Sequence, residues 1–354
     1  MPGTFLERLW SSPMFLEYAR PVSEDEVYSP YSYYMRKDGT LIFCTGVLRE
    51  GKQILILAEP VRFPRIVEIE TLARRESLFD FPFYSITKVC NEGSMENAQD
   101  VQKGEVLKII AASEGSIMDF RERSYYGGAV FLPSEMAFAF SPRQAWRKAV
   151  EIGNDKVKRT SEWVTSVSSI TRDDLGMTGS GMFGIIDADD EDVDMVYFGS
   201  LEQLLQIRFA IRDGVVNGRF RALEEFGKVW PLRVWLNEDI QQCPFFVLRD
   251  PSESFAYKAQ IDITDQIAEI EFTVSDDRMN MISPIVLKTE NVTIGGSAAP
   301  ALPLVITNTF YRGDFYEGDR LHGSSAMIAT LTTFGGDSFP VYLVKEWNVL
   351  SKMN

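Results

Sequence analysis

The sequence predicts an α+β fold in three parts: a β-rich N-terminal domain over residues 1–138, a mixed core of helices and strands over 139–288, and a small all-β module over 289–354. Short apolar runs separated by turn residues dominate the first part. Apolar residues at helical spacing begin only near Ser141, and alternating strands with glycine turns return at the end. The chain has 354 residues, more than one usual domain, and 45% of them are apolar, enough to build buried cores.

The N-terminal part has the pattern of strands joined by tight turns. Residues 33–36 and 41–44 flank Lys37-Asp38-Gly39, and Asp-Gly favours a hairpin turn. Two further strands are expected over 53–57 and 105–110. Four tyrosines lie close together here: Tyr28, Tyr31, Tyr33 and Tyr34. Such aromatic residues can stack on bases, but beside a hairpin they more often pack within a sheet.

The core begins with helices. Ser141 is a good helix N-cap and Pro142 suits the first helical position. The helical pattern continues to about residue 168, with a break expected at Gly153-Asn154. The elements expected next are a strand, turn and helix over 175–186, a strand over 193–198, an amphipathic helix over 201–212, and strands over 232–235, 245–248 and 268–272.

The C-terminal part is predicted to be all-β. The turn-rich segment 293–300 is expected to be a linker or a long loop. The strands expected after it are 304–307, 326–333 and 341–347. The stretch 313–321 resembles the loop-to-strand entry of small barrels such as OB-folds, which would make the module a site for an acceptor or a partner.

Charge and composition restrict the chemistry. The chain has 36 basic and 51 acidic residues, a net charge of −15, which argues against a general nucleic-acid coating protein because phosphate binding needs Lys and Arg. The three cysteines, Cys44, Cys90 and Cys243, lie far apart and predict buried free thiols. His322 is the only histidine, so acid–base or metal chemistry must use carboxylates.

No segment of the sequence has the pattern of a signal peptide, and no apolar run approaches the roughly 20 residues that span a bilayer. A soluble, cytoplasmic protein with no membrane partner is therefore expected.

A glycine-rich turn is the first candidate for a binding site. Gly179-Ser180-Gly181 follows an apolar strand and opens a helix. Backbone N–H groups at such a turn favour phosphate oxygens, and the Ser180 hydroxyl adds a donor. Glycines at 179 and 181 would let a polyphosphate approach the backbone.

Two carboxylates form the second candidate. Asp192 and Asp194 lie two residues apart on an expected strand, so both side chains point to the same face. Paired carboxylates make a hard-oxygen site suited to Mg²⁺ or Mn²⁺. Such ions assist phosphoryl displacement.

Together these residues resemble a known group. Leu175 to Ser180, a gap of eleven residues and then Asp192-Val193-Asp194-Met195 is similar to the pattern of the DNA polymerase β-type nucleotidyltransferase superfamily, and of small prokaryotic nucleotidyltransferase-domain proteins in particular. The resemblance covers about residues 140–215. It implies a mixed sheet, a third carboxylate from a later strand, and metal-dependent transfer of a nucleoside monophosphate from an NTP to a hydroxyl. The acceptor, an RNA end, a protein side chain or a small molecule, stays open.

The third carboxylate is expected at Asp262, whose apolar neighbours suit a strand, with Asp239 and Glu269 as rivals. Glu191 departs from the family pattern, which has a small residue there. The acidic run Asp187–Glu191 is expected to be a solvated loop. Four arginines are candidates for binding the triphosphate or form a solvated face: Arg208, Arg212, Arg219 and Arg221.

Two other classes of function remain open. A chain with the same fold but no third acid would be a catalytically silent nucleotide-binding or scaffold protein. A structural protein of a virus or an assembly would fit the β-rich flanks and the acidic charge, and would leave the Gly-Ser and Asp-x-Asp pattern as a coincidence.

Overall fold

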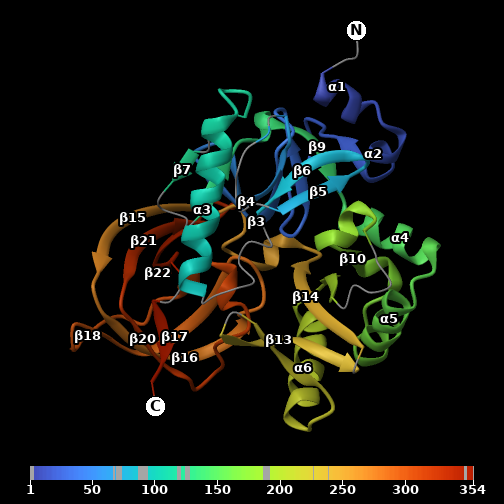
Figure 1. Cartoon of the computed structure of the whole chain (residues 1–354). Coiled ribbons are helices and arrows are strands. Elements are labelled where there is room, and N and C mark those ends of the chain that lie inside the picture. The colour runs from blue at the N-terminus through green and yellow to red at the C-terminus, as the bar shows by residue number, and fades with distance from the viewer. Residues whose placement is uncertain are drawn as a thin grey trace.

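The computed structural model describes residues 4–353 except 67, 69–73, 87–94, 118–120, 124–127, 186–191, 226, 238, 347 and 348. Within these residues, three β-sheets follow one another along the chain, and α-helices accompany the first and the middle sheet (Figure 1). This arrangement confirms the α+β class. The expected loop Asp187–Glu191 and the thiol of Cys90 lie outside the described residues.

The N-terminal sheet is antiparallel throughout its described pairings. Its strands are β1 (Ala19–Pro21), β2 (Tyr33–Arg36), β3 (Leu41–Glu50), β4 (Gln53–Pro64), β5 (Arg74–Leu78), β6 (Phe81–Ser85), β7 (Arg121–Arg123), β8 (Gly128–Phe131) and β9 (Met136–Phe140). They lie in the order β1-β9-β2-β3-β4-β6-β5, with β8 pairing with β4 and β7. The tyrosines predicted to pack within a sheet are all buried: Tyr28, Tyr31, Tyr33 and Tyr34.

Helices accompany this sheet. Two short helices precede it, α1 (Phe5–Trp10) and α2 (Pro13–Tyr18). The strand expected over 105–110 is wrong, because these residues belong to α3 (Met95–Ala112). Val106 and Ile109, three residues apart, are both buried, and Leu107 between them is exposed. Burial at this spacing is typical of a helix. The stretch 105–110 is too short for its apolar pattern to distinguish a helix from a strand.

The core sheet carries the candidate site. Its strands are β10 (Leu175–Met177), β11 (Asp192–Gly199), β12 (Arg221–Glu225), β13 (Lys228–Asn237) and β14 (Ile240–Leu248). They lie in the order β10-β11-β14-β13-β12. β11 runs parallel to β14, and the other neighbours are antiparallel.

Helices cover one face of the core sheet: α4 (Pro142–Ile152), α5 (Asp155–Val167) and α6 (Leu201–Val216). The break expected at Gly153-Asn154 is confirmed. Gly153 ends α4 in the left-handed conformation, and the Asn154 side chain caps α5 by accepting from the Val157 N–H at 3.1 Å. Val157 and Val193 belong to one apolar cluster, which joins the helices to β11.

The C-terminal sheet begins earlier than the sequence pattern indicates. Its strands are β15 (Gln260–Ile267), β16 (Ile270–Met279), β17 (Ile285–Ile294), β18 (Ser297–Ala298), β19 (Leu304–Ile306), β20 (Arg320–Gly323), β21 (Ala326–Thr332), β22 (Ser338–Val344) and β23 (Leu350–Lys352). The order is β15-β21-β22-β19-β17-β16-β20-β23, with β18 beside β17. Strands before residue 288, in the part predicted to belong to the core domain, thus pair with strands after residue 289. The two domain boundaries, after residues 138 and 288, stay predictions.

The segment 293–300, expected to be a linker or a long loop, instead forms a hairpin over residues 293–298. Ile294 of β17 pairs with Ser297 of β18. Gly295 and Gly296 between them both have positive φ, at 55° and 78°, which glycine adopts without strain. The small, flexible composition of this segment therefore reflects a tight turn within the sheet.

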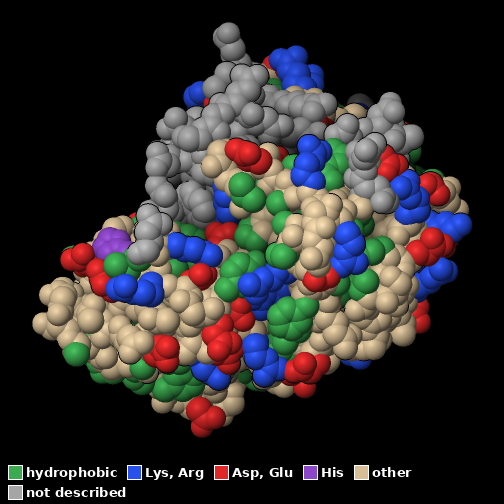
Figure 2. Space-filling model, turned by 90° about the horizontal axis from the view of Figure 1, so that it is seen from below, with side chains coloured by type: hydrophobic (Ala, Val, Ile, Leu, Met, Phe, Trp, Pro, Cys, Tyr) green, Lys and Arg blue, Asp and Glu red, His purple; other side chains and the backbone are tan. Residues whose placement is uncertain are grey.

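The three sheets contact one another closely around the core. Arg208 of α6 is buried and forms an ion pair with Asp277 of β16. Lys228 of β13 pairs with Asp314 at 2.7 Å. On the face shown in Figure 2, acidic and basic side chains alternate among the described residues without a continuous basic surface. No helix within the described ranges is long and apolar enough to cross a membrane.

Candidate functional site

The glycine-rich turn is fixed to the strand that follows it. β10 ends at Met177, and a 3₁₀ turn, Gly179–Phe183, starts directly after Thr178. The Thr178 N–H donates to the Asp194 carbonyl at 2.9 Å, and the Thr178 hydroxyl donates to the Tyr31 carbonyl at 2.8 Å. The turn is thus anchored both to β11 and to the N-terminal domain.

Gly179 is required by its neighbour Asp194. Its φ is +60°, in the left-handed region. A Cβ placed on Gly179 would lie 2.8 Å from Cγ of Asp194 and closer still to one carboxylate oxygen. The carboxylate therefore lies directly against the backbone of the turn, and any larger residue would displace it.

Gly181 is also constrained by packing. A Cβ on this residue would lie 2.6 Å from Cγ of Met177, so the glycine is needed for packing against β10. It still lines the pocket beside Ser180, but it is buried.

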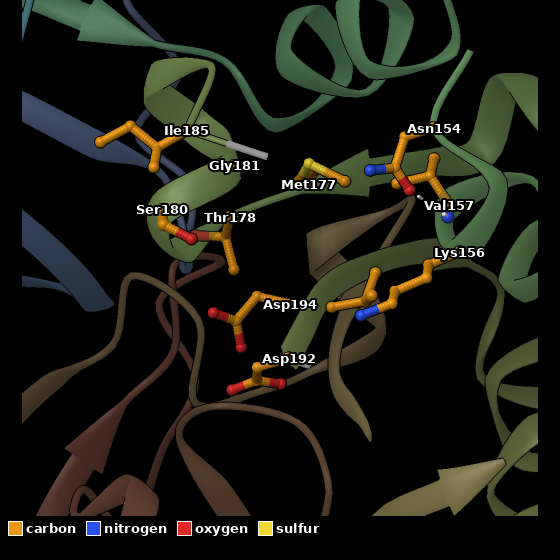
Figure 3. Close-up of a pocket in the computed structure, with 11 residues that line it drawn as sticks. Asn154, Lys156, Val157, Met177, Thr178, Ser180, Gly181, Ile185, Asp192 and Asp194 are labelled. Atoms are coloured by element: carbon orange, nitrogen blue, oxygen red, sulfur yellow. Dashed lines mark hydrogen bonds between the residues drawn. The ribbon is translucent and has the colours of Figure 1, made fainter. Parts of the chain in front are cut away.

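The two carboxylates share one face of β11, as predicted. Val193 and Met195, which alternate with them, are buried against the helices. Asp192 and Asp194 are half-buried and line a pocket together with Ser180 (Figure 3). The structure thus brings together the sequence-predicted turn and the sequence-predicted pair of acids.

Residues from the α4–α5 junction complete this pocket. Asn154 and Lys156 come from the start of α5, and the Lys156 side chain points toward the carboxylates (Figure 3). The volume of the pocket is about 20 Å³. This space is enough for one ion or one water molecule. A nucleotide would therefore place only a cation and phosphate oxygens inside it and extend outward.

The neighbouring strand supplies no acid beside the pair. β14 places Gln241 opposite Asp192 and Cys243 opposite Asp194. Cys243 is a buried free thiol, as predicted, and so is Cys44. Burial raises the pKa of Cys243 well above its ordinary value, so the thiol is neutral at pH 7.

Arg233 of β13 reaches across to the carboxylates. It forms an ion pair with Asp192 at 3.1 Å and another with Glu225. Burial acts to lower the pKa of Arg233, but the negative groups around it, Asp192 and Glu225 among them, raise it further above its usual range. The sequence alone showed no basic neighbour of the pair, because Arg233 is distant along the chain.

The predicted third carboxylate is not part of this site. Asp262 lies on β15 in the C-terminal sheet, is exposed, and accepts hydrogen bonds from Gln260. The rivals are also occupied elsewhere: Asp239 pairs with Arg159 at 2.7 Å, and Glu269 contacts His322. In the part of the chain that the structure describes, no group of three or more His, Cys, Asp or Glu is arranged to hold a metal ion.

The arginines considered for the triphosphate lie outside the pocket. Arg208 pairs with Asp277, and Arg219 pairs with Asp213. Arg212 lies over the ring of Tyr316, and Arg221 over that of Trp235. Lys156 is the cation that lines the pocket, and only the packing of α5 against β11 reveals it.

Comparison with known proteins finds no match for this chain among protein-family models, curated proteins or solved structures.

Proposed function

We propose that the chain is a metal-dependent nucleotidyltransferase that moves a nucleoside monophosphate from an NTP to a hydroxyl acceptor. The observation that carries the proposal is the contact between Asp194 and Gly179. It joins the phosphate-binding turn to the cation-binding carboxylates in one pocket. Neither feature alone would indicate this chemistry.

The arrangement of the core strands supports this proposal. A short strand, a glycine turn and an antiparallel strand with Asp-x-Asp are followed by α6 and a strand parallel to β11. The glycine turn before an Asp-x-Asp strand and the mixed sheet are the features that the resemblance to the polymerase β-type superfamily leads us to expect. The helices lie on one face of the sheet, which leaves the carboxylates on the other.

The residues present fit one divalent cation. Mg²⁺ is commonly bound by one or two carboxylates together with waters and substrate phosphates. Asp192 and Asp194 supply the two carboxylates, and the pocket is of ionic size. When bound, the ion would neutralise phosphate charge at the reacting phosphorus.

Other groups of the chain would bind the phosphates. Ser180 lines the same pocket as the carboxylates and would donate its hydroxyl to a phosphate oxygen, and Lys156 adds a positive charge. In the transfer, the acceptor oxygen would bond to the α-phosphorus while the bond to pyrophosphate breaks. The hydroxyl proton would pass to solvent.

The test is incubation of the purified protein with each α-labelled NTP and Mg²⁺ or Mn²⁺, alone and with total cell RNA or lysate. We expect label transfer that is lost in an Asp192→Ala/Asp194→Ala variant. Transfer that persists in this variant would refute the proposed site.

A second candidate is a catalytically silent nucleotide-binding protein of the same fold. Two observations favour it: the neighbouring strand places Cys243, and no acid, opposite Asp194, and Arg233 already pairs with Asp192. This candidate predicts metal-dependent nucleotide binding that the double variant loses, with no label transfer to any acceptor.

A further inference from the structure

A second cleft lies next to the carboxylate pocket. It is formed by α4, the start of α5 and the turn before β10, and its volume is about 440 Å³. Asn154 lines both the cleft and the pocket. Leu175 in the cleft and Met177 in the pocket belong to the same strand, β10. The cleft therefore adjoins the pocket that contains the carboxylates.

The cleft is basic in an acidic protein. Its charged side chains comprise four cations and two acids, whereas the whole chain has a net charge of −15. The cations are Arg143, Arg147, Lys158 and Arg172, and the acids are Glu151 and Asp173. The net charge of the cleft lining is thus positive, whereas that of the whole chain is negative. Because acids outnumber bases in the chain, a random placement of charged side chains would favour acids.

Three of these cations are available to a ligand. Arg147, Lys158 and Arg172 are exposed and come from α4, α5 and the turn before β10. Within the described residues, none of the three forms an ion pair. Convergence of unpaired cations from three separate elements is typical of an anion-binding surface.

The fourth cation, Arg143, is held at the base of the cleft. It lies over the ring of Phe198 at 4.2 Å and donates to the Asp173 carbonyl. Burial lowers its pKa, and Arg249 and Arg147 add to this effect while Asp174 opposes it. Arg143 and Arg147 are thus close enough to repel one another, and an anion bound beside them would relieve that repulsion.

We infer that this cleft binds the acceptor of the transfer reaction and that the acceptor carries phosphate groups next to its reacting hydroxyl. This inference rests on the proposed function, since it names the substrate of the same site. A single-stranded nucleic-acid end and a phosphorylated small molecule share the required chemistry.

The test measures acceptor binding separately from nucleotide binding. Two probes are used. Binding of a fluorescein-labelled single-stranded RNA with a free 3′ hydroxyl is measured by fluorescence anisotropy, and binding of ribose 5-phosphate is measured by calorimetry. The cleft variant is Arg147→Glu/Arg172→Glu. The control is Arg8→Glu/Lys52→Glu, which changes charge equally at exposed residues that line neither cleft. Binding of Mn²⁺ and ATP is measured in each protein.

We expect the wild type and the control to bind one probe, and the cleft variant to bind it at least about 10-fold more weakly, with Mn²⁺–ATP binding unchanged. If RNA is that probe, the slope of log affinity against log salt concentration should become shallower by about 0.7 for each phosphate contact that is lost. Binding of the RNA would identify a nucleic-acid end as the acceptor. Binding of ribose 5-phosphate would identify a phosphorylated small molecule as the acceptor.

Equal binding by the cleft variant and the control, or no binding of either probe to the wild type, would overturn the inference. A wild-type protein that binds an acceptor probe but does not bind Mn²⁺–ATP would refute the proposed function and leave the cleft assignment intact. The two failures are therefore distinguishable.

Discussion

The carboxylate of Asp194 occupies the space that a side chain at residue 179 would fill. Gly179 is in the left-handed region at φ +60°, and its backbone lies against that carboxylate. The glycine therefore serves two purposes: it forms the turn and it lets the acid approach the backbone of that turn.

Gly179→Ala should weaken Mn²⁺–nucleotide binding by roughly 10- to 100-fold, the range found when a group that positions a metal ligand is changed. The reason is that the added methyl group displaces Asp194. Binding is measured by calorimetry with a non-hydrolysable ATP analogue.

Gly218→Ala is the matched control. Gly218 also has positive φ, +68°, but a Cβ there meets nothing within 4 Å. Both variants should lose about 1–2 kcal/mol of stability from the strained backbone. Equal nucleotide binding in the two variants would show that the contact with Asp194 does not matter.

Asp194→Ala should reduce transfer by at least about 10²-fold, the scale for one preorganised electrostatic contact. Asp262→Ala should leave transfer unchanged, because Asp262 is exposed on another sheet. Initial rates with a labelled NTP check both. The opposite ranking of the two variants would restore Asp262 as the third acid.

Arg233→Met should lower the free energy of unfolding by about 1–3 kcal/mol in the absence of metal, because Asp192 and Glu225 lose a charged partner. Added Mg²⁺ should stabilise this variant more than it stabilises the wild type, since a cation replaces the guanidinium. Urea unfolding with and without Mg²⁺ measures the difference. Arg221→Met, on the same sheet, is the control and should respond as the wild type does.

Cys243→Asp should raise Mn²⁺ affinity by about 10-fold, because it adds a carboxylate opposite Asp194 and affinity follows the charge of the ligand set. Cys243→Ser serves as the control for the change in packing. If the wild type binds nucleotide without transferring it, Cys243→Asp is also expected to gain transfer. A folded Cys243→Asp protein with unchanged Mn²⁺ affinity would contradict this geometry.

Asp174 gives the stability of the site a pH dependence. Burial acts to raise its pKa, but hydrogen bonds from Thr171 and the charge of Arg249 lower it below its usual 3.8. A lowered carboxyl pKa stabilises the fold fully above the unfolded value, and this contribution is lost as pH falls through the folded value.

Asp174→Asn should therefore cost about 1 kcal/mol at pH 7, and the difference from the wild type should shrink below about pH 4. Urea unfolding at several pH values measures it. Asp173→Asn, its exposed neighbour, should stay within about 0.5 kcal/mol of the wild type throughout. A constant difference for Asp174→Asn at all pH values would contradict the ion pair that Asp174 forms with Arg249 at 2.9 Å.

Local patterns were sufficient for much of the fold and for half of the site. Ser141-Pro142 and Gly153-Asn154 are start and stop signals, so the sequence predicts α4 and α5 well. Asp192 and Asp194 share a face because side chains alternate on any strand. Ser180 and Gly179 follow from turn chemistry.

What could not be predicted depends on pairing between distant segments. Asp262 has the same local pattern as a core strand, and only its pairing with Thr330 places it in the C-terminal sheet. Cys243 and Arg233 reach the carboxylates through the order of strands β11, β14 and β13. No local spacing contains that order, so the sequence alone could not show that, among the described residues, Asp262 lies away from the carboxylate pair.

The most direct test of the central claim is to locate the cation. Crystals grown with Mn²⁺ and a non-hydrolysable ATP analogue would be measured for the anomalous signal of manganese. We expect a peak coordinated by Asp192 and Asp194, with the phosphates against Gly179 and Ser180. A nucleotide bound elsewhere, or a peak that touches neither carboxylate, would contradict it.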